Sequence, residues 1–396
     1  MYTIYIKDAL TASAPWKTLH NPMRDQDGLI VIEATLEEEL NTHGSLSFRI
    51  AQTNPLYDAL HERTTLVKVS SDTKGRKVWF GRVMSIERSL DNTLQVYCEG
   101  ELAFLCDSSD RPFAFRGDPS ALFSALIAAY NGSNTLGPTF AVGNVSVTDP
   151  NTYIVRSSED PATIWERMED SLFGSSLGGY VLPRYDEEND VHYIDYLALD
   201  ENDQYAHTST QVVRFGENLL SFAKTSNASN IVTALIPYGA EIEDTQDPEY
   251  DPVPPTPTLG TVEHWDGNRR TIRDANNGRR WIDHSAGQAI WGRIVGTKVW
   301  DDVTLASNLL TKATAWLNQQ VYANLTLEVS AIDLSFVDAD IEQIQVGDYV
   351  RVESKPHDLN ALLLCSSKTT VLTNLEESGI VLGVGLKSIS DLQAGK

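Results

Sequence analysis

Short runs of alternating apolar and polar residues fill the first 107 positions and constrain the fold more than any other feature. Turn-forming clusters such as Asp25–Gly28 and Asp72–Gly75 separate six such runs: Met1–Lys7, Leu29–Leu36, Gly44–Ile50, Thr65–Ser70, Lys77–Arg88 and Thr93–Glu99. Alternation with a period of two buries one face of a strand and exposes the other. Six strands at short spacing therefore predict a barrel or a sandwich.

Helical spacing appears after residue 107. Asp118-Pro119 and Asp160-Pro161 each place an N-cap residue before a proline at the first helical position, and Gly174 is the expected end of the second helix. A hairpin is predicted next, with strands over Tyr180–Tyr185 and Val191–Leu199 around the acidic turn 186–190. This stretch is therefore expected to be α+β.

The rest of the chain is again mostly strand-like. A helix is predicted over residues 304–321, and strands over Gln211–Phe215, Leu219–Thr225, Ile231–Tyr238, Asn324–Leu334, Tyr349–Ser354, Ala361–Val371 and Gly379–Gly385. The expected fold class is α+β, mainly β. The expected domains are 1–107 (first β-barrel), 108–210 (α+β), 211–240 (bridging strands), 241–300 (inserted loop-rich segment) and 301–396 (helix and second β-barrel).

Residues 240–257 form the clearest loop in the sequence. They hold six acidic residues, five prolines and no base. Such a composition cannot bury enough apolar surface to order itself. We expect a mobile surface loop.

Charge and cysteine content exclude several classes of protein. There are 31 Lys+Arg against 55 Asp+Glu, a net charge of −24. Such a chain repels nucleic acid and anionic membranes by default, which favours either simple solubility or a surface past which DNA moves without sticking. Cys98, Cys106 and Cys365 form no CxxC pair, which indicates reduced thiols and cytosolic folding. The start of the chain does not resemble a signal peptide, and no apolar run reaches the length of about 18 residues that a membrane span needs.

The sequence contains no HExxH, P-loop, GxGxxG or CxxC motif. The histidines are scattered without an i,i+4 pair: His20, His43, His61, His192, His207, His264, His284 and His357. We therefore predict no catalytic residue, no cofactor site and no metal site, and expect that the chain is not an enzyme.

Other groups of residues could bind a ligand, although a simpler explanation is favoured for each. Asp338, Asp340 and Glu342 could hold calcium but fit a solvated loop better, and the acidic turn 186–190 fits a solvated hairpin turn. The 8 tryptophans and 15 tyrosines could stack on a sugar, but core and subunit-interface packing explains them more simply. Sequons at Asn131, Asn144, Asn227 and Asn324 carry little weight without a sign of secretion.

Two stretches, in the same order, resemble one known family. The first runs from the helix at 160–173 through Leu177–Tyr185, His192–Leu197 and Glu217–Phe222 to Asn227–Gly239. The second runs from Val299–Thr304 through the helix that follows to Leu327–Leu334, Val346–Val352, Ser354–His357 and Gly379–Gly383. These motifs are similar to the hub region of siphophage tail-associated proteins, often labelled prophage tail endopeptidase.

The resemblance implies a baseplate hub similar to that of contractile tails. Such hubs are homotrimers in which each subunit supplies two β-barrel-like tube domains, so that three chains match a sixfold tail tube. The implied partners are other copies of the chain, a distal tail protein, a tape measure protein, and a tail fibre or spike, with DNA only in transit and no membrane insertion. The implied location is the tail tip of a virion assembled in the host cytoplasm.

The chain ends at 388–396, just past the last matching strand, where many family members continue into a peptidase or fibre region. We therefore expect a hub without an attached hydrolase. Two alternatives stay open at this stage: a peptidoglycan hydrolase with its site within 108–320, and a receptor-binding or glycan-binding tail module.

Overall fold

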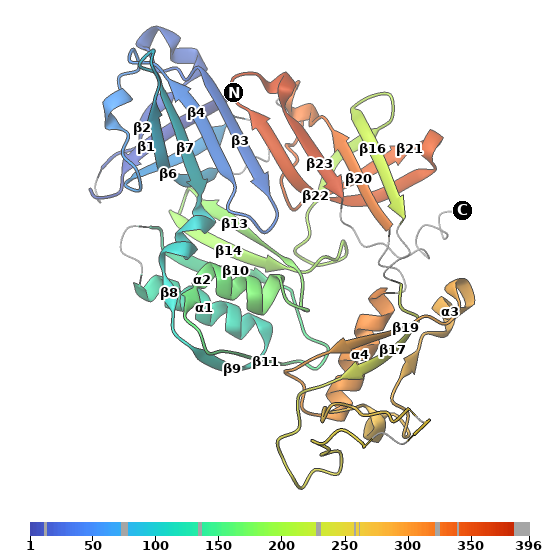
Figure 1. The fold of residues 1–396 in the computed structure, drawn as a ribbon. Coiled ribbons are helices and arrows are strands. Elements are labelled where there is room, and N and C mark those ends of the chain that lie inside the picture. The colour runs from blue at the N-terminus through green and yellow to red at the C-terminus, as the bar shows by residue number, and fades with distance from the viewer. Residues whose placement is uncertain are drawn as a thin grey trace.

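One continuous sheet of thirteen strands occupies both ends of the chain in the computed structural model (Figure 1). The model describes residues 1–11, 14–72, 78–133, 137–226, 231–256, 259–260, 262–320, 325–338 and 340–383. The sheet divides into two curled units, each with its own apolar core. The expected fold class, α+β and mainly β, is confirmed.

Unit 1 contains the seven N-terminal strands. They are β1 (Tyr2–Asp8), β2 (Lys17–His20), β3 (Glu33–Glu39), β4 (Ser45–Ile50), β5 (Thr65–Ser71), β6 (Trp79–Arg88) and β7 (Leu94–Gly100). Their order in the sheet is β3-β4-β7-β6-β5-β1-β2. The inward side chains of Ile4, Phe48 and Val96 are fully buried. Asn54 links β2 to the segment just before β3, which are the two ends of this strand order. Its side-chain amide donates hydrogen bonds to the carbonyls of Leu19 and Ile30 at 2.9 and 3.1 Å.

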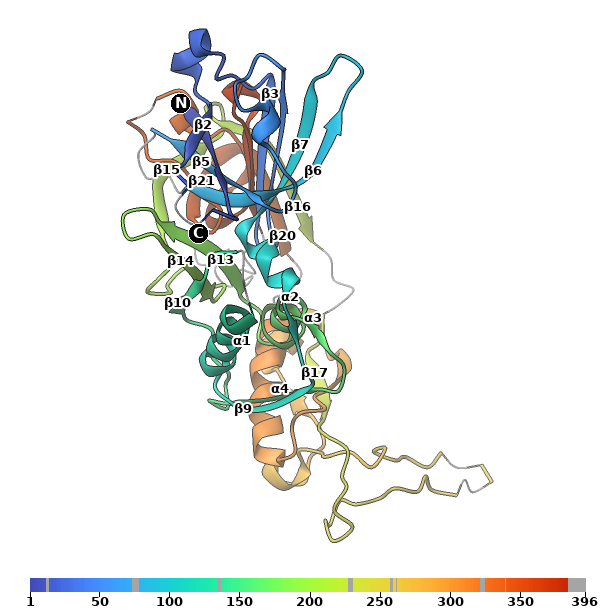
Figure 2. The ribbon, with the colours of Figure 1, turned by 90° about the vertical axis from the view of Figure 1, so that its left-hand side faces the viewer.

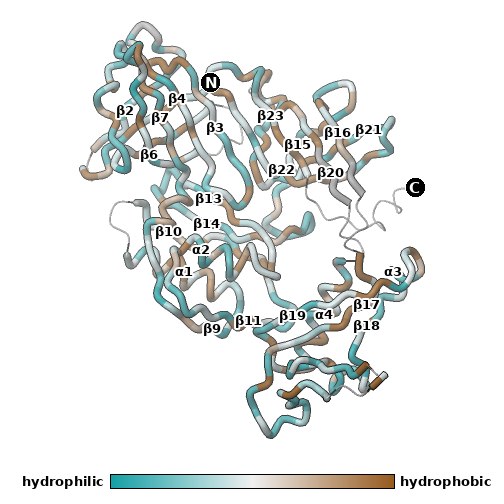
Figure 3. The backbone as a smooth tube through the Cα atoms, viewed as in Figure 1, coloured by the Kyte–Doolittle hydropathy of each residue, from teal (hydrophilic) through white to brown (hydrophobic). Residues whose placement is uncertain are grey.

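Unit 2 contains strands from the C-terminal half. They are β15 (Thr208–Arg214), β16 (Leu219–Ser226), β20 (Leu325–Ala331), β21 (Tyr349–Ser354), β22 (Leu359–Val371) and β23 (Gly379–Gly383). Their order is β16-β20-β23-β22-β21-β15. Val329, Val350 and Leu382 are fully buried in its core. Figure 3 shows hydrophobic and hydrophilic residues following one another along the strands of both units, as half-buried strands require.

An α+β region lies beside the two units. Its elements are β8 (Ser109–Asp110), β9 (Phe113–Gly117), α1 (Pro119–Ser133), β10 (Phe140–Val145), β11 (Ile154–Ser158), β12 (Ala162–Thr163), α2 (Ile164–Met168), β13 (Tyr180–Asp186) and β14 (Val191–Leu197). The predicted N-cap at Asp160 is wrong. Thr163 caps α2 instead, through a capping box with Glu166 that satisfies two backbone N–H groups. The helix continues as a π-helix over Glu169–Phe173, with Gly174 as its C-cap as predicted.

The remaining region packs a small sheet against one helix. It contains β17 (Ala234–Tyr238), β18 (Ile282–Asp283), α3 (Ser285–Trp291), β19 (Val295–Val299) and α4 (Ala306–Gln320). Leu235 of β17 packs with Leu309 and Leu317 of α4.

The acidic segment that follows β17 projects from the body (Figure 2). The guanidinium of Arg270 pairs with Asp247 and Glu249, and Thr271 donates hydrogen bonds to Glu249. The composition of residues 240–257 alone does not reveal this tether, because Arg270 and Thr271 lie outside the segment.

Candidate functional site: a continuous polar sheet face

Strand β22 joins the two units. Its first half pairs with β21 from Leu359↔Ser354 to Leu364↔Tyr349. Its second half leaves β21 and pairs with β3 of unit 1, from Ser367↔Glu39 to Val371↔Thr35. One bent strand therefore belongs to both units and makes their sheet continuous. We call the β22–β3 pairing the in-chain joint.

The two units repeat one strand topology. Five consecutive strands of unit 1 lie in the order β3-β4-β7-β6-β5, and five consecutive strands of unit 2 lie in the order β16-β20-β23-β22-β21. In both units this order is first, second, fifth, fourth and third along the chain. Every pairing between neighbours within these two sets is antiparallel.

A register shift at the same place strengthens the match. The β6–β7 ladder shifts between Val83 and Ser85, and the β22–β23 ladder shifts between Cys365 and Ser367. Val83 and Cys365, which precede the shift, are both fully buried. Bulges re-aim a strand and are specific features of a fold, so their equivalence aligns the units residue by residue.

Two strand edges stay open in the described part of the chain. β16 pairs with β20 on one side and has no strand partner on the other. β6 pairs with β5 through Trp79–Arg82, whereas the same edge over Ser85–Arg88 has no strand partner. An open edge presents unpaired backbone N–H and C=O groups and is a template for a further strand.

The outward side chains of β3, β4, β7, β16, β20 and β23, and of the second halves of β6 and β22, form one continuous face that is mostly polar. In unit 1 the exposed or half-buried members are Glu33, Thr35, Glu37, Glu39, Ser45, Ser47, Arg49, Ser85, Glu87, Gln95, Tyr97 and Glu99. In unit 2 the described members are Ser221, Ala223, Ser330, Ser367, Thr369, Val371, Gly379 and Val381. We call this set the polar face.

The unit 1 part of the polar face is acidic. Five glutamates stand against Arg49, which pairs with Glu33 at 3.1 Å, and Arg82, which is buried and pairs with Asp107 and Glu99. The pKa of Tyr97 is raised by partial burial and by the charges of Glu99 and Glu37. Tyr97, in the middle of this face, therefore lies in a negative electrostatic potential.

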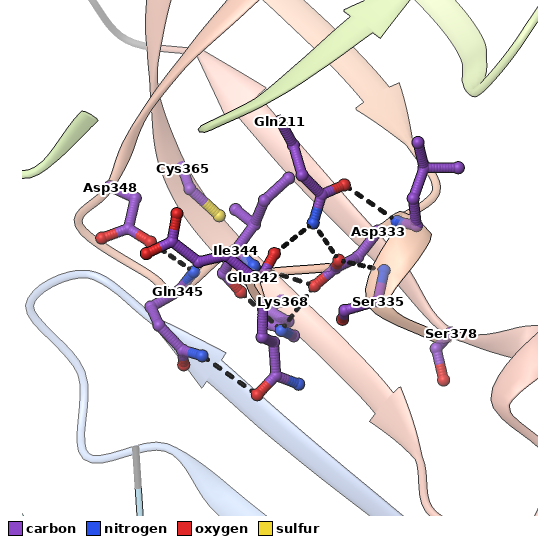
Figure 4. Close-up of polar contacts among 12 residues, drawn as sticks. Gln211, Asp333, Ser335, Glu342, Ile344, Gln345, Asp348, Cys365, Lys368 and Ser378 are labelled. Atoms are coloured by element: carbon purple, nitrogen blue, oxygen red, sulfur yellow. Dashed lines mark hydrogen bonds and ion pairs between the residues drawn. The ribbon is translucent and has the colours of Figure 1, made fainter. Parts of the chain in front are cut away.

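A buried polar network supports the in-chain joint from below (Figure 4). The Lys368 ammonium bonds Asp333 at 3.0 Å and the carbonyl of Ile344, and both charged side chains are at most 1% exposed. Asp333 also accepts hydrogen bonds from the amide of Gln211 and from the backbone N–H groups of Ser335 and Ile344. Every described contact satisfies a charge that burial would otherwise make costly.

The same network reaches unit 1. The amide of Gln343 donates to the Tyr2 hydroxyl at 2.6 Å, and the amide of Gln345 donates to Gln343. Burial, with the charges of Glu38 and Asp333, raises the pKa of Tyr2 far above its usual value. The joint is thus held both by the sheet and by side chains that no short motif in the sequence brings together.

The residues considered for calcium do not converge. Glu342 accepts hydrogen bonds from Thr210, and Asp338 accepts one from the backbone of Asp340. Within turn 186–190, Asp186 accepts hydrogen bonds from Glu188 and Asn189. Across the described ranges, no three His, Cys, Asp or Glu side chains lie close enough together to hold a metal ion.

One histidine makes a contact that the sequence did not suggest. His192 Nδ1 lies 2.6 Å from Glu101, and both side chains are buried. The His192 ring stacks on Tyr185 and meets the edge of Phe80. Burial raises the pKa of Glu101, and the hydrogen bond and charge of His192 oppose that rise. The hydrogen bond between Glu101 and His192 therefore links the α+β region to unit 1, and the rings of Tyr185 and Phe80 pack against this pair.

The tryptophans lie partly in the interior and partly on the surface, and the structure describes two of the four sequons, Asn131 and Asn144. Trp79, Trp165 and Trp300 are buried, Trp16, Trp291 and Trp316 are half-buried, and Trp265 and Trp281 are more than one third exposed. The side chain of Asn131 exchanges two hydrogen bonds with the backbone of Phe140. Sequons Asn227 and Asn324 and the C-terminal segment 388–396 lie outside the described residues. None of the helices in the described ranges is long and apolar enough to cross a membrane.

Three solved structures share this fold over nearly the whole chain. The prophage tail protein gp18 of Listeria monocytogenes EGD-e has a TM-score of 0.55 at 13% identity and covers 99% of this chain and 98% of its own. The tail protein of Neisseria meningitidis MC58 gives 0.57 at 12% identity, covering 96% and 95%. The 43 kDa tail protein of prophage MuSo2 from Shewanella oneidensis gives 0.52 at 12% identity, covering 96% and 97%.

Sequence comparison finds similarity to one family in the C-terminal half. No curated protein matches the chain. Residues 207–393 match the family model described as prophage endopeptidase tail. This range contains all of unit 2 and the region of α4. The predicted resemblance to the prophage tail endopeptidase family is therefore confirmed: residues 207–393 carry it, and the chain as a whole has the fold of phage tail proteins.

Proposed function

We propose that the chain is a structural subunit of a phage-type tail tip, in which three copies form a ring that caps or extends the tail tube. The duplicated topology carries the proposal. Two equivalent units already stand edge to edge in one chain. Among the described residues, the two strand edges equivalent to those of this joint, on β6 and β16, have no strand partner. Head-to-tail contacts of this kind produce a closed ring when the rotation closes. Three chains then supply six equivalent units.

The polar face fits the inner surface of such a ring. DNA binds proteins mainly where Lys and Arg neutralise its phosphates. The unit 1 part carries five glutamates, and its Arg49 pairs with Glu33. The described side chains of the unit 2 part are small and neutral. We propose that this face lines the opening and lets DNA pass at ejection without being held.

The proposal gives this chain no catalytic role. The most suggestive acid–base pair, Glu101 and His192, is buried, and its histidine ring is packed between Tyr185 and Phe80. A hydrolase needs its acid and base within reach of a substrate. A fastening role between two regions explains these contacts better than a role in peptidoglycan cleavage.

The remaining parts of the proposal follow from the family. The ring would contact a distal tail protein on one side and a fibre or spike on the other, with a tape measure protein in the opening. It would reside in the virion at the tail tip after assembly in the host cytoplasm. DNA would be a partner only in transit.

The self-assembly of purified protein tests the proposal. Light scattering over a concentration series should show a species of about three times the 43.8 kDa of one chain. A mass that stays at one chain at every concentration would contradict a self-assembling ring.

A further inference from the structure

We infer that neighbouring copies join by adding residues Ser85–Arg88 of β6 to the open edge of β16 on the next copy, as an antiparallel pair. This inference rests on the proposed ring and names the surface that closes it. The occupant of each open edge is a second copy of this chain. This pairing would continue the pattern of the in-chain joint, where β22 already pairs in this way with β3.

The two joints start from equivalent strands. In unit 2, β22 pairs with β21, passes its bulge at Ser366, and continues into the pairing with β3. In unit 1, β6 pairs with β5, passes its bulge at Met84, and continues with that edge open. The strand that receives β22 is the first of unit 1, and the equivalent first strand of unit 2 is β16. The missing partner of β6 is therefore β16.

The bulges also fix the register. Ser367 aligns across unit 2 with Val381, Ser330 and Ser221, and Ser85 aligns across unit 1 with Tyr97, Ser47 and Thr35. Ser221 is therefore equivalent to Thr35, and Ala223 to Glu37. Because Thr369 faces Glu37 in the in-chain joint, Glu87 should face Ala223 of the next copy.

The side chains on the open edge of β16 leave room for this pairing. Lys224 is the one charged residue in the sequence of β16. Over 219–223 the strand carries no charge, and Leu220, Ser221 and Ala223 are exposed, Leu220 by 61%. Edge strands that must stay unpaired are usually protected by charges, prolines or bulges that turn them away. β16 instead presents small side chains on the polar face, with Leu220 at a register shift near its start. An exposed edge of this composition is expected to be covered.

A disulfide at the predicted pair tests the joint directly. The variant Glu87→Cys with Ala223→Cys is made in a Cys106→Ser background, because Cys106 is exposed whereas Cys98 and Cys365 are buried. Directly opposed residues of an antiparallel pair have Cα atoms about 4.5–5.5 Å apart, within the range for a disulfide. After mild oxidation, non-reducing electrophoresis should show covalent dimers and trimers that reductant dissolves.

Two matched variants control the geometry. Glu37→Cys with Thr369→Cys places the equivalent pair at the in-chain joint and should form a disulfide within one chain. Glu37→Cys with Ala223→Cys should form none between chains, because β22 already occupies the edge of β3 at Glu37. Covalent trimers from the last variant as readily as from the first would overturn the register.

Light scattering separates the two levels of the argument. A trimer whose Glu87→Cys/Ala223→Cys pair stays reduced, while the in-chain pair closes, would overturn this inference and leave the ring standing. A monomer at every concentration would contradict both the β6–β16 pairing and the proposed ring.

A charge swap tests the same contact without cysteines. Ala223→Asp places a carboxylate opposite Glu87, and like charges directly opposite one another weaken a strand pair. The concentration for half-assembly should rise by roughly two- to fivefold per interface. Adding Glu87→Lys should reverse the rise, and a swap without effect on assembly would contradict the register.

Discussion

Units 1 and 2 share their strand order, their antiparallel pairing and the position of one bulge, yet equivalent positions hold different residues. Ile86 of β6 corresponds to Lys368 of β22, and Glu37 of β3 corresponds to Ala223 of β16. Lys368 is buried in an ion pair, whereas Ile86 packs partly buried on an apolar core. The backbone topology is repeated, and the side chains have adapted to what each joint must contact.

This difference indicates which interactions stabilise each joint. The in-chain joint lies over a polar network that can form only within one folded chain. At the equivalent position of β6, Ile86 packs on an apolar core instead. The pairing of β6 would therefore depend on the backbone and on neighbouring copies. One joint belongs to the fold, and the other, by our proposal, belongs to the assembly.

The largest expected effect comes from breaking the in-chain joint. Lys368→Met leaves the fully buried Asp333 carboxylate without its cation. Removing one partner of a buried pair costs about 3–5 kcal/mol. Urea unfolding followed by circular dichroism should show this loss in the free energy of unfolding.

The matched control is Ile86→Met at the equivalent position of unit 1. Swaps between apolar side chains of similar volume cost less than about 1.5 kcal/mol. Equal losses from the two variants would break the comparison, because the network under Lys368 would then contribute nothing. The double variant Lys368→Met/Asp333→Asn should recover part of the loss.

A smaller effect should come from the acidic part of the polar face. Glu37→Lys with Glu39→Lys reverses two exposed charges per chain without touching a buried group. If this face lines the opening, the assembled variant should bind short duplex DNA. The slope of log affinity against log salt concentration should become more negative by roughly 0.9 for each phosphate contacted. Fluorescence anisotropy at two salt concentrations measures the slope.

The control for this variant is Glu376→Lys with Glu377→Lys, which reverses two exposed charges away from the polar face. It should leave DNA binding close to that of the unaltered protein. Equal DNA binding by both variants would mean that net charge matters and position does not.

The sequence predicted most strands of both units because their alternation follows directly from burial on one face. Tyr349–Ser354 agrees with its strand to the residue, and β4 and β6 differ from the prediction by one or two residues at one end. β2 was missed because four residues show too little alternation. The elements within 260–300 were missed because β18, α3 and β19 are short and lie between irregular segments.

The candidate site was largely hidden in the sequence. The acidity of the chain was evident, but the strand register decides which glutamates share a face. The family resemblance implied two β-barrel-like domains, but their residue-by-residue equivalence was hidden because equivalent positions such as Ile86 and Lys368 share no chemistry. Glu101 and His192 are 91 residues apart, and only the packing of the α+β region on unit 1 brings them together.

Electron microscopy of the assembled protein would show whether three chains form a ring of six equivalent units. Class averages along the axis should show six similar lobes around an opening, built from three chains, because each chain supplies two equivalent units. A ring of six chains, or three chains whose averages show three lobes and no opening, would contradict the account.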